Sequence, residues 1–137
     1  MPLYLCNMKT GSVPAGAKAK IAKDITDIHC KATDAPPEFV HVFFLEEGEA
    51  PALEGNRVFL QGNIRAGRNG DQKDEIVRGM CSSISRHAGL DISDIGMQLM
   101  DVPASWVMEG GDVFPEPGEE AAWLQAHAAR LAAEEAQ

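Results

Sequence analysis

The sequence MPLYLC, residues 1–6, places a proline directly before an apolar run that has the character of a β-strand. Proline is small enough for us to expect removal of Met1, which would leave Pro2 as a free secondary amine. An α-amino group titrates near ~7.7–8.0, where general acids and bases work well, and burial or a nearby cation lowers its pKa further. Many chains begin Met-Pro without a catalytic reason, so this prediction depends on partners elsewhere in the chain.

Beyond this strand, which we place at 2–8, the first half of the chain (about 2–45) predicts strand, helix and strand. A break ends the first strand, and Pro14 suits the first turn of a helix. Apolar residues at helical spacing continue this helix to about residue 32: Ala17, Ile21, Ile25 and Ile28. The aromatic and β-branched run FVHVFFL, residues 39–45, predicts a buried strand.

The second half (about 57–102) repeats this order after a loop at 46–56. A strand at 57–64 leads into a turn, and Asp71 is a suitable cap for the helix that follows. This helix is predicted to end near residue 89, with an apolar face made of Ile76, Met80 and Ile84. A fourth strand is predicted within 92–102.

Two such units predict an α+β fold with a four-stranded sheet and both helices on one face, because each unit favours a right-handed parallel crossover. The other face must be covered, most simply by copies of the chain. Residues 103–137 then add a loop at 106–117 and a C-terminal helix at 119–133, docked lightly or on a neighbour. Helical spacing gives this helix one predicted face: Leu124, His127, Ala128 and Leu131.

Length and charge restrict the class of protein. The 137 residues suit a single domain over 1–137 with an adequate core. A formal net charge of −9 argues against a nucleic-acid partner and against an anionic membrane surface, although it allows a small acid held by a few local arginines. Apolar runs fall short of the ~20 residues of a membrane span, and Lys9 interrupts any signal-peptide core, so we expect a cytoplasmic protein.

The cysteines and histidines predict neither a metal site nor a disulfide framework. The three cysteines are an odd number without close pairing, which favours free thiols: Cys6, Cys30 and Cys81. No two histidines have metal-ligand spacing, and no phosphate-binding motif occurs, so we expect no metal and no cofactor. We place His41 on the second face of its strand, and His87 and His127 on helix surfaces.

Arg65 and Arg68 flank a glycine in the predicted turn before the second helix. Two guanidiniums beside exposed backbone N–H groups would make a site for a carboxylate. The alternative is a pair of solvent-exposed turn arginines.

His29 and Glu109 are the other candidates. His29 lies near the end of the first helix, where a histidine can hydrogen-bond an anion or serve packing alone. Glu109 lies beside two glycines, which suggests a loop that bends around something; the alternative is an ordinary exposed glutamate.

Together these features resemble the tautomerase superfamily, and within it the cis-3-chloroacrylic acid dehalogenase group. The matching segments are the Met-Pro start, IAKDITDIH (21–29), IRAGR (64–68), PA (103–104), VMExG (107–111) and FPxPGE (114–119). The resemblance covers roughly residues 2–124. It implies a fold of two β-α-β units per chain, assembled as a homotrimer.

The resemblance also implies roles for individual residues. Pro2 would be the catalytic acid or base that acts on an enol or an unsaturated acid. Arg65 and Arg68 would clamp the substrate carboxylate, and His29 would hydrogen-bond it. Glu109 would be the carboxylate that activates water in the dehalogenase.

In the dehalogenase group this carboxylate works with a tyrosine, and the corresponding position here holds Gln98, which lacks a phenol. Gln98 can still bind substrate through hydrogen bonds. Keto–enol tautomerisation needs only proton transfer and a polarised carboxylate, so the resemblance favours tautomerisation of small acids. Hydration or dehalogenation of 3-haloacrylate-like acids through Glu109 is the alternative. A decarboxylase, or a non-enzymatic trimeric binding or assembly protein on the same scaffold, are further readings.

Overall fold

The computed structural model describes residues 1–47 and 53–136, and within them four strands form a mixed sheet in the order β2-β1-β3-β4. Strand β1 pairs in parallel with β2 and antiparallel with β3, and β3 pairs in parallel with β4. The strands are β1 (Leu3–Met8), β2 (His41–Glu46), β3 (Val58–Arg65) and β4 (Ile95–Val102). Two parallel β-α-β units therefore meet at a central antiparallel pair, which confirms the predicted α+β architecture.

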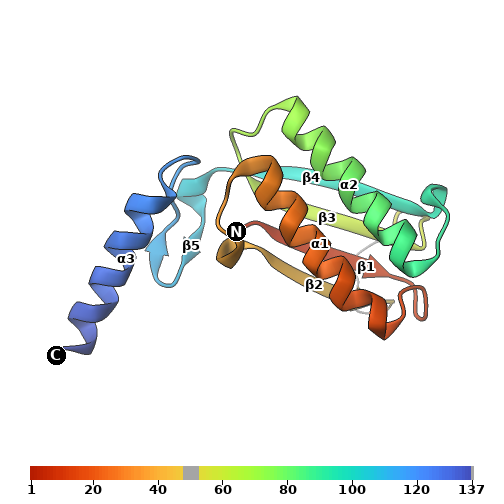
Figure 1. Cartoon of the computed structure of the whole chain (residues 1–137), viewed down its shortest axis with the longest axis horizontal. Coiled ribbons are helices and arrows are strands. Elements are labelled where there is room, and N and C mark those ends of the chain that lie inside the picture. The colour runs from red at the N-terminus through yellow and green to blue at the C-terminus, as the bar shows by residue number, and fades with distance from the viewer. Residues whose placement is uncertain (48–52, 137) are drawn as a thin grey trace.

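Helices α1 (Ala15–Thr33) and α2 (Gly70–Ala88) lie side by side on one face of this sheet (Figure 1). Most of the predicted apolar residues of both helices are buried, although Ile28 is only partly so. The fully buried helix residues pack against Val58 and Leu60 of β3: Ile21, Ile25, Ile76, Met80 and Ile84. Each such side chain contributes about 1.5–3 kcal/mol by leaving water. This packing fixes which face of the sheet receives the helices.

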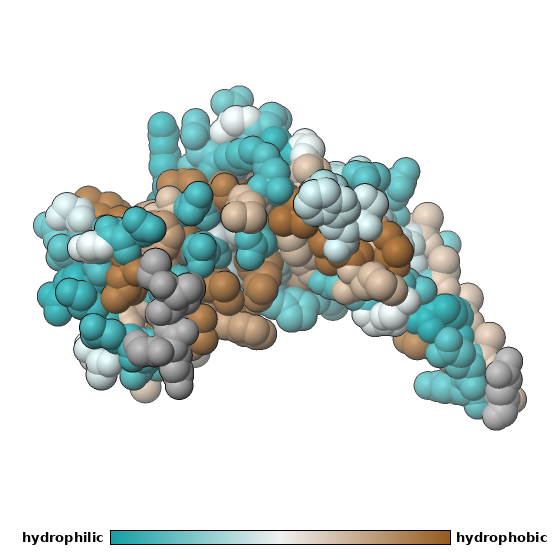
Figure 2. Space-filling model, turned by 180° about the vertical axis from the view of Figure 1, so that it is seen from behind, coloured by the Kyte–Doolittle hydropathy of each residue, from teal (hydrophilic) through white to brown (hydrophobic). Residues whose placement is uncertain are grey.

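The opposite sheet face has no covering layer within residues 1–47 and 53–136. Strand alternation places Leu5 of β1, Phe43 of β2 and Gln98 of β4 on it, in one row across the sheet. Figure 2, seen from that side, shows apolar side chains gathered over its middle. Phe43 is 53% exposed. The prediction of a buried strand at 39–45 was therefore wrong for one face of β2, since that burial would need a second layer.

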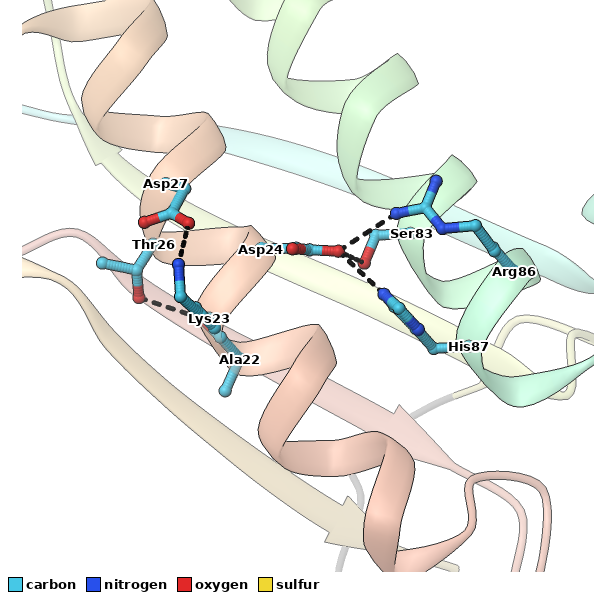
Figure 3. Close-up of polar contacts among 8 residues, drawn as sticks. All are labelled: Ala22, Lys23, Asp24, Thr26, Asp27, Ser83, Arg86 and His87. Atoms are coloured by element: carbon cyan, nitrogen blue, oxygen red, sulfur yellow. Dashed lines mark hydrogen bonds and ion pairs between the residues drawn. The ribbon is translucent and has the colours of Figure 1, made fainter.

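A polar cluster joins α1 to α2 on their outer side (Figure 3). The Asp24 carboxylate of α1 accepts hydrogen bonds from Ser83 Oγ at 2.8 Å and from Arg86 Nη2 at 3.2 Å. It also lies 3.0 Å from His87 Nε2, so His87 is paired and half-buried, whereas we predicted a helix-surface position. The cluster fixes the two helices against each other.

Two local predictions need correction. Residues Pro37–Phe39 form a short 3₁₀ helix, η1, so Phe39 precedes β2 instead of starting it. Helix α2 is capped by Asn69 rather than Asp71, because Asn69 and Gln72 form a reciprocal capping box with two 2.8 Å hydrogen bonds.

The predicted loop at 106–117 contains a small hairpin. A second 3₁₀ helix, η2 (Ile92–Asp94), precedes β4, and η3 (Ala104–Trp106) leads from β4 into the hairpin strands β5 (Met108–Glu109) and β6 (Asp112–Val113). Gly110 and Gly111 form its turn with φ of 59° and 88°, which side-chain-bearing residues rarely adopt.

Helix α3 (Glu120–Glu135) extends away from the sheet at one end of the molecule (Figure 1). It docks on the hairpin through Trp123, His127 and Arg130: His127 Nδ1 lies 2.5 Å from the Asp112 carboxylate, and Arg130 Nε donates to the same carboxylate. Of the predicted face, His127 takes part in this docking, whereas Leu124, Ala128 and Leu131 stay exposed.

Other predictions have simpler outcomes. Cys6, Cys30 and Cys81 are unpaired, as predicted. Of the predicted loop at 46–56, residues 48–52 lie outside the described part of the chain. No helix in the described part is long and apolar enough to cross a membrane.

Candidate functional site

The amino terminus lies in a buried setting between two acceptors. The Met1 amine donates to the Phe39 carbonyl at 2.9 Å and forms an ion pair with Glu109 of β5. Burial, and then the Arg65 charge, lower the pKa of this amine to about 5. Glu109 acts in the opposite direction, because a carboxylate favours the protonated amine. An amine held in this way can exchange a proton with a bound ligand near neutral pH.

The Met1 side chain fills the space beside this amine. It is only 9% exposed and packs in a small apolar cluster with Phe39 and Phe114. Val102, Val107 and Trp123 border the same cluster. Pro2 is also buried, so both of the first two residues are enclosed by the fold.

His29 of α1 and Tyr4 of β1 form a buried pair beside this cluster. The Tyr4 hydroxyl lies 2.7 Å from His29 Nδ1, and the two rings meet edge to face. Burial, with Arg68, Arg65 and the amino terminus as further causes, lowers the pKa of His29 to about 3, so the imidazole is neutral. Burial raises the pKa of Tyr4, so its phenol stays protonated. When Tyr4 donates to Nδ1, the ring proton is on Nε2.

Arg65 ends β3 as a fully buried cation. Its guanidinium stacks over the Phe114 ring at 4.9 Å and near Phe39 at 5.9 Å. One nitrogen donates to the Pro115 carbonyl and the other to Glu120 Oε1, each at 2.8 Å. The arginine therefore connects the sheet to the start of α3.

Arg68 follows in the turn before α2 and is half-buried. It donates to the Thr33 carbonyl at 3.3 Å, and its Nε is buried without a hydrogen-bond partner. Burial and the nearby Arg65 charge lower the pKa of its guanidinium, which nevertheless stays ionised. A cation with unused donors is suited to hold an anion.

The fold gathers five of the six residues predicted from the sequence at one end of the sheet. Figure 1 shows the amino terminus at this end of the sheet, beside the end of α1 and near the segment that leads from β4 to β5. The five are Pro2, His29, Arg65, Arg68 and Glu109. Gln98 lies apart from them. On β4 it is four residues before Val102, the partner of Arg65, which corresponds to about 13 Å along the strand.

Four residues of this site were missed from the sequence: Tyr4, Phe39, Phe114 and Glu120. Tyr4 could have been found from the sequence, because it is two residues from Pro2 and so lies on the same side of the strand. A glycine inside a strand, here Gly62, often marks a place where another group comes close. Gly62 pairs with Tyr4, and a Cβ at Gly62 would fall 2.6 Å from the Tyr4 ring. Glu120 had none, since it meets Arg65 only through the fold.

The described residues do not bring three or more His, Cys, Asp or Glu side chains together as a metal site. The groups that lie at this end of the sheet are an amine, a carboxylate, a neutral imidazole, a phenol and two guanidiniums.

Comparison with solved structures gives related folds. The crystal structure of N1, a member of the cis-3-chloroacrylic acid dehalogenase family, superimposes with a TM-score of 0.78 at 26% identity, over 89% of this chain and 90% of that chain. Native Ps01740 is 34% identical, with a TM-score of 0.69 over 79% of this chain and 100% of that chain.

A fused 4-OT protein, solved as a symmetric trimer, has a TM-score of 0.70 at 21% identity over 82% of this chain and 95% of that chain; this likeness concerns the fold alone. No protein-family model and no curated protein matches the sequence.

Proposed function

The chain belongs to the tautomerase superfamily and resembles its cis-3-chloroacrylic acid dehalogenase group, and we propose that it is an enzyme that moves a proton on small α-keto or enol acids. Pro2, freed by removal of Met1, is the general acid or base, and a substrate carboxylate binds at the arginine pair. Phenylenolpyruvate represents this substrate class. One proton transfer of this kind contributes ~10²–10⁴-fold to the rate.

The buried amino terminus is the observation that carries the proposal. Its surroundings lower the pKa of the Met1 amine, and the same burial and the same Arg65 charge would act on an amine one residue further along. A Pro2 amine that is neutral at pH 7 is able to accept a proton from an enol.

The space taken by Met1 supports a ligand position next to this amine. Removal of Met1 vacates volume against the Phe39 and Phe114 rings, beside Glu109. The vacated volume is apolar on two sides, which suits the carbon skeleton of a small organic acid. Arg68 and His29 then provide hydrogen-bond donors at its polar end.

We further propose that the active form is a homotrimer that buries the open face of the sheet. Exposed apolar side chains on and near this face support this: Phe43, Met100, Trp106 and Met108. The related 4-OT protein is a symmetric trimer. Gln98 lies on the same face, so it reaches a substrate only if a neighbouring copy brings it to a site.

Hydration of an unsaturated or 3-halogenated acid is a second candidate, favoured by one contact. Glu109 is paired with the amino terminus, where a carboxylate can orient a water molecule against a bound acid. This activity predicts release of halide from 3-chloroacrylate, lost in Glu109→Gln. Absence both of halide release and of a hydration product from an unsaturated acid would remove this candidate and leave tautomerisation.

The test of the main proposal joins a mass measurement to an assay. Intact-mass analysis establishes whether Met1 is removed, and ketonisation of phenylenolpyruvate is then followed for the wild type and Pro2→Ala. We expect a chain that begins at Pro2 and a variant at least 100-fold slower. A variant as active as the wild type would show that the amine is not the catalyst, and a chain without activity would favour a binding or assembly protein.

A further inference from the structure

The two arginines of the site differ in how their charge is balanced. Arg65 is 2% exposed and its guanidinium is paired with the Glu120 carboxylate of α3. Burial is the largest single influence and opposes ionisation of Glu120, but the hydrogen bond from Arg65, the Arg65 charge and the backbone hydrogen bonds together outweigh it and lower the pKa of the carboxyl. Glu120 is therefore charged at neutral pH and occupies the donor that an incoming carboxylate would use.

Arg68 has no such partner. Within residues 1–47 and 53–136 no carboxylate forms an ion pair with it, and its only hydrogen bond is to the Thr33 carbonyl. Its buried Nε donates to nothing. Of the two cations, Arg68 is therefore the one whose charge no carboxylate of the described residues pairs.

Glu120 is held in this place by its own element. Its second oxygen accepts from the Gly118 backbone N–H at 2.9 Å, just before the first turn of α3. The Arg65 guanidinium is in turn fixed by the Pro115 carbonyl and by the Phe114 ring. This pair is built into the fold and does not depend on a mobile surface contact.

We propose that Glu120 is a specificity-determining residue that restricts the site to acids with one carboxylate near the arginines. With Arg65 neutralised, Arg68 takes a single carboxylate, and a second carboxylate would meet Glu120 without a free cation to receive it. The inference rests on the proposed function, since it names the substrate class of that same site.

The experiment measures binding of two unreactive acids, butyrate and glutarate, by NMR titration of the chain that begins at Pro2. Three proteins are compared: the wild type, Glu120→Gln and Glu119→Gln. Gln at 120 has the shape of Glu but only one acceptor oxygen, so it keeps one of the two hydrogen bonds and gives up the charge, and the variant is expected to fold. Glu119 is exposed, makes no side-chain cap and is the adjacent residue, so its variant removes the same charge without touching Arg65.

We expect the wild type and Glu119→Gln to bind butyrate at least as tightly as glutarate. In Glu120→Gln the freed guanidinium should increase the affinity for glutarate about tenfold relative to that for butyrate. An unchanged ratio in Glu120→Gln, a wild type that prefers glutarate tenfold, or no binding of either acid to any of the three proteins would overturn the inference.

Ketonisation separates this inference from the proposed function. If Pro2-dependent ketonisation occurs while the glutarate-to-butyrate ratio does not respond to Glu120→Gln, the inference is wrong and the proposed function stands. If the ratio responds but Pro2→Ala is as active as the wild type, the specificity role of Glu120 stands and the proposed catalyst is wrong.

Discussion

The hydroxyl of Tyr4 lies 2.7 Å from Nδ1 of His29, and both side chains are buried, so the imidazole is enclosed as a neutral group. An unfolded chain protonates this histidine below about pH 6.5, whereas in the folded chain its pKa is about 3. The unfolded state therefore binds more protons between these values, and stability falls as the pH decreases through this window.

Replacing His29 by Gln removes this dependence while keeping a neutral hydrogen-bonding side chain beside Tyr4. The difference in free energy of unfolding between the wild type and His29→Gln should change by up to about 1.4 kcal/mol per pH unit below pH 6.5. Denaturant unfolding at several pH values and one fixed protein concentration measures it. Parallel stability curves would mean that His29 titrates equally in both states.

Arg68→Gln should weaken substrate binding. Loss of a charge-assisted hydrogen bond of about 1.5–3 kcal/mol raises KM for phenylenolpyruvate by roughly 10- to 100-fold. Arg78 is exposed on α2, and Arg78→Gln provides the control, with an unchanged KM. Equal KM values for the two variants would show that Arg68 does not hold the carboxylate.

Phe43→Asp should break the assembly that we propose on the open sheet face, because a charge at the centre of an apolar interface is costly to bury. Ile92 offers a matched control, since it is 54% exposed against 53% for Phe43 but lies in η2. Light scattering after size exclusion should give a trimer for the wild type and Ile92→Asp, and a monomer for Phe43→Asp. A monomeric wild type would contradict the proposed trimer.

The hairpin that carries Glu109 should tolerate no side chain at Gly110. A Cβ there would fall 2.5 Å from the His127 ring, whereas one at Gly11 meets no atom within 4 Å, although both glycines have positive φ. Gly110→Ala should therefore cost about 1–3 kcal/mol more than Gly11→Ala, by overpacking against α3. Equal losses in thermal unfolding would mean that backbone strain alone decides the effect.

The order of elements could be predicted from the sequence because apolar spacing is local. The recurring isoleucines of α1 and the alternation in β3 each depend on neighbours within one element. The cap of α2 could also have been predicted from the sequence. Asn69 and Gln72 are three residues apart, the spacing of a capping box, and this pattern is a stronger sign of the helix start than Asp71 alone.

The site was only partly predictable, because its main contacts cross long separations. Glu120 meets Arg65 from 55 residues away, and Glu109 meets the amino terminus through a hairpin that the sequence suggested only as a loop. The docking face of α3 was only partly predicted: His127 belongs to the predicted face, but Trp123 and Arg130, which lie at helical spacing from it, dock beside it because Val113 and Asp112 meet them there. Burial of β2 depends on what covers its open face.

The most direct test of the account is the rate of phenylenolpyruvate ketonisation by two chains that differ only at the amino terminus. One begins at Pro2, and the other keeps an uncleaved residue before it, so that its Pro2 nitrogen is an amide. We predict that the chain that begins at Pro2 is at least 100-fold faster at pH 7, because only a free amine can transfer the proton. Equal rates would contradict a catalytic Pro2.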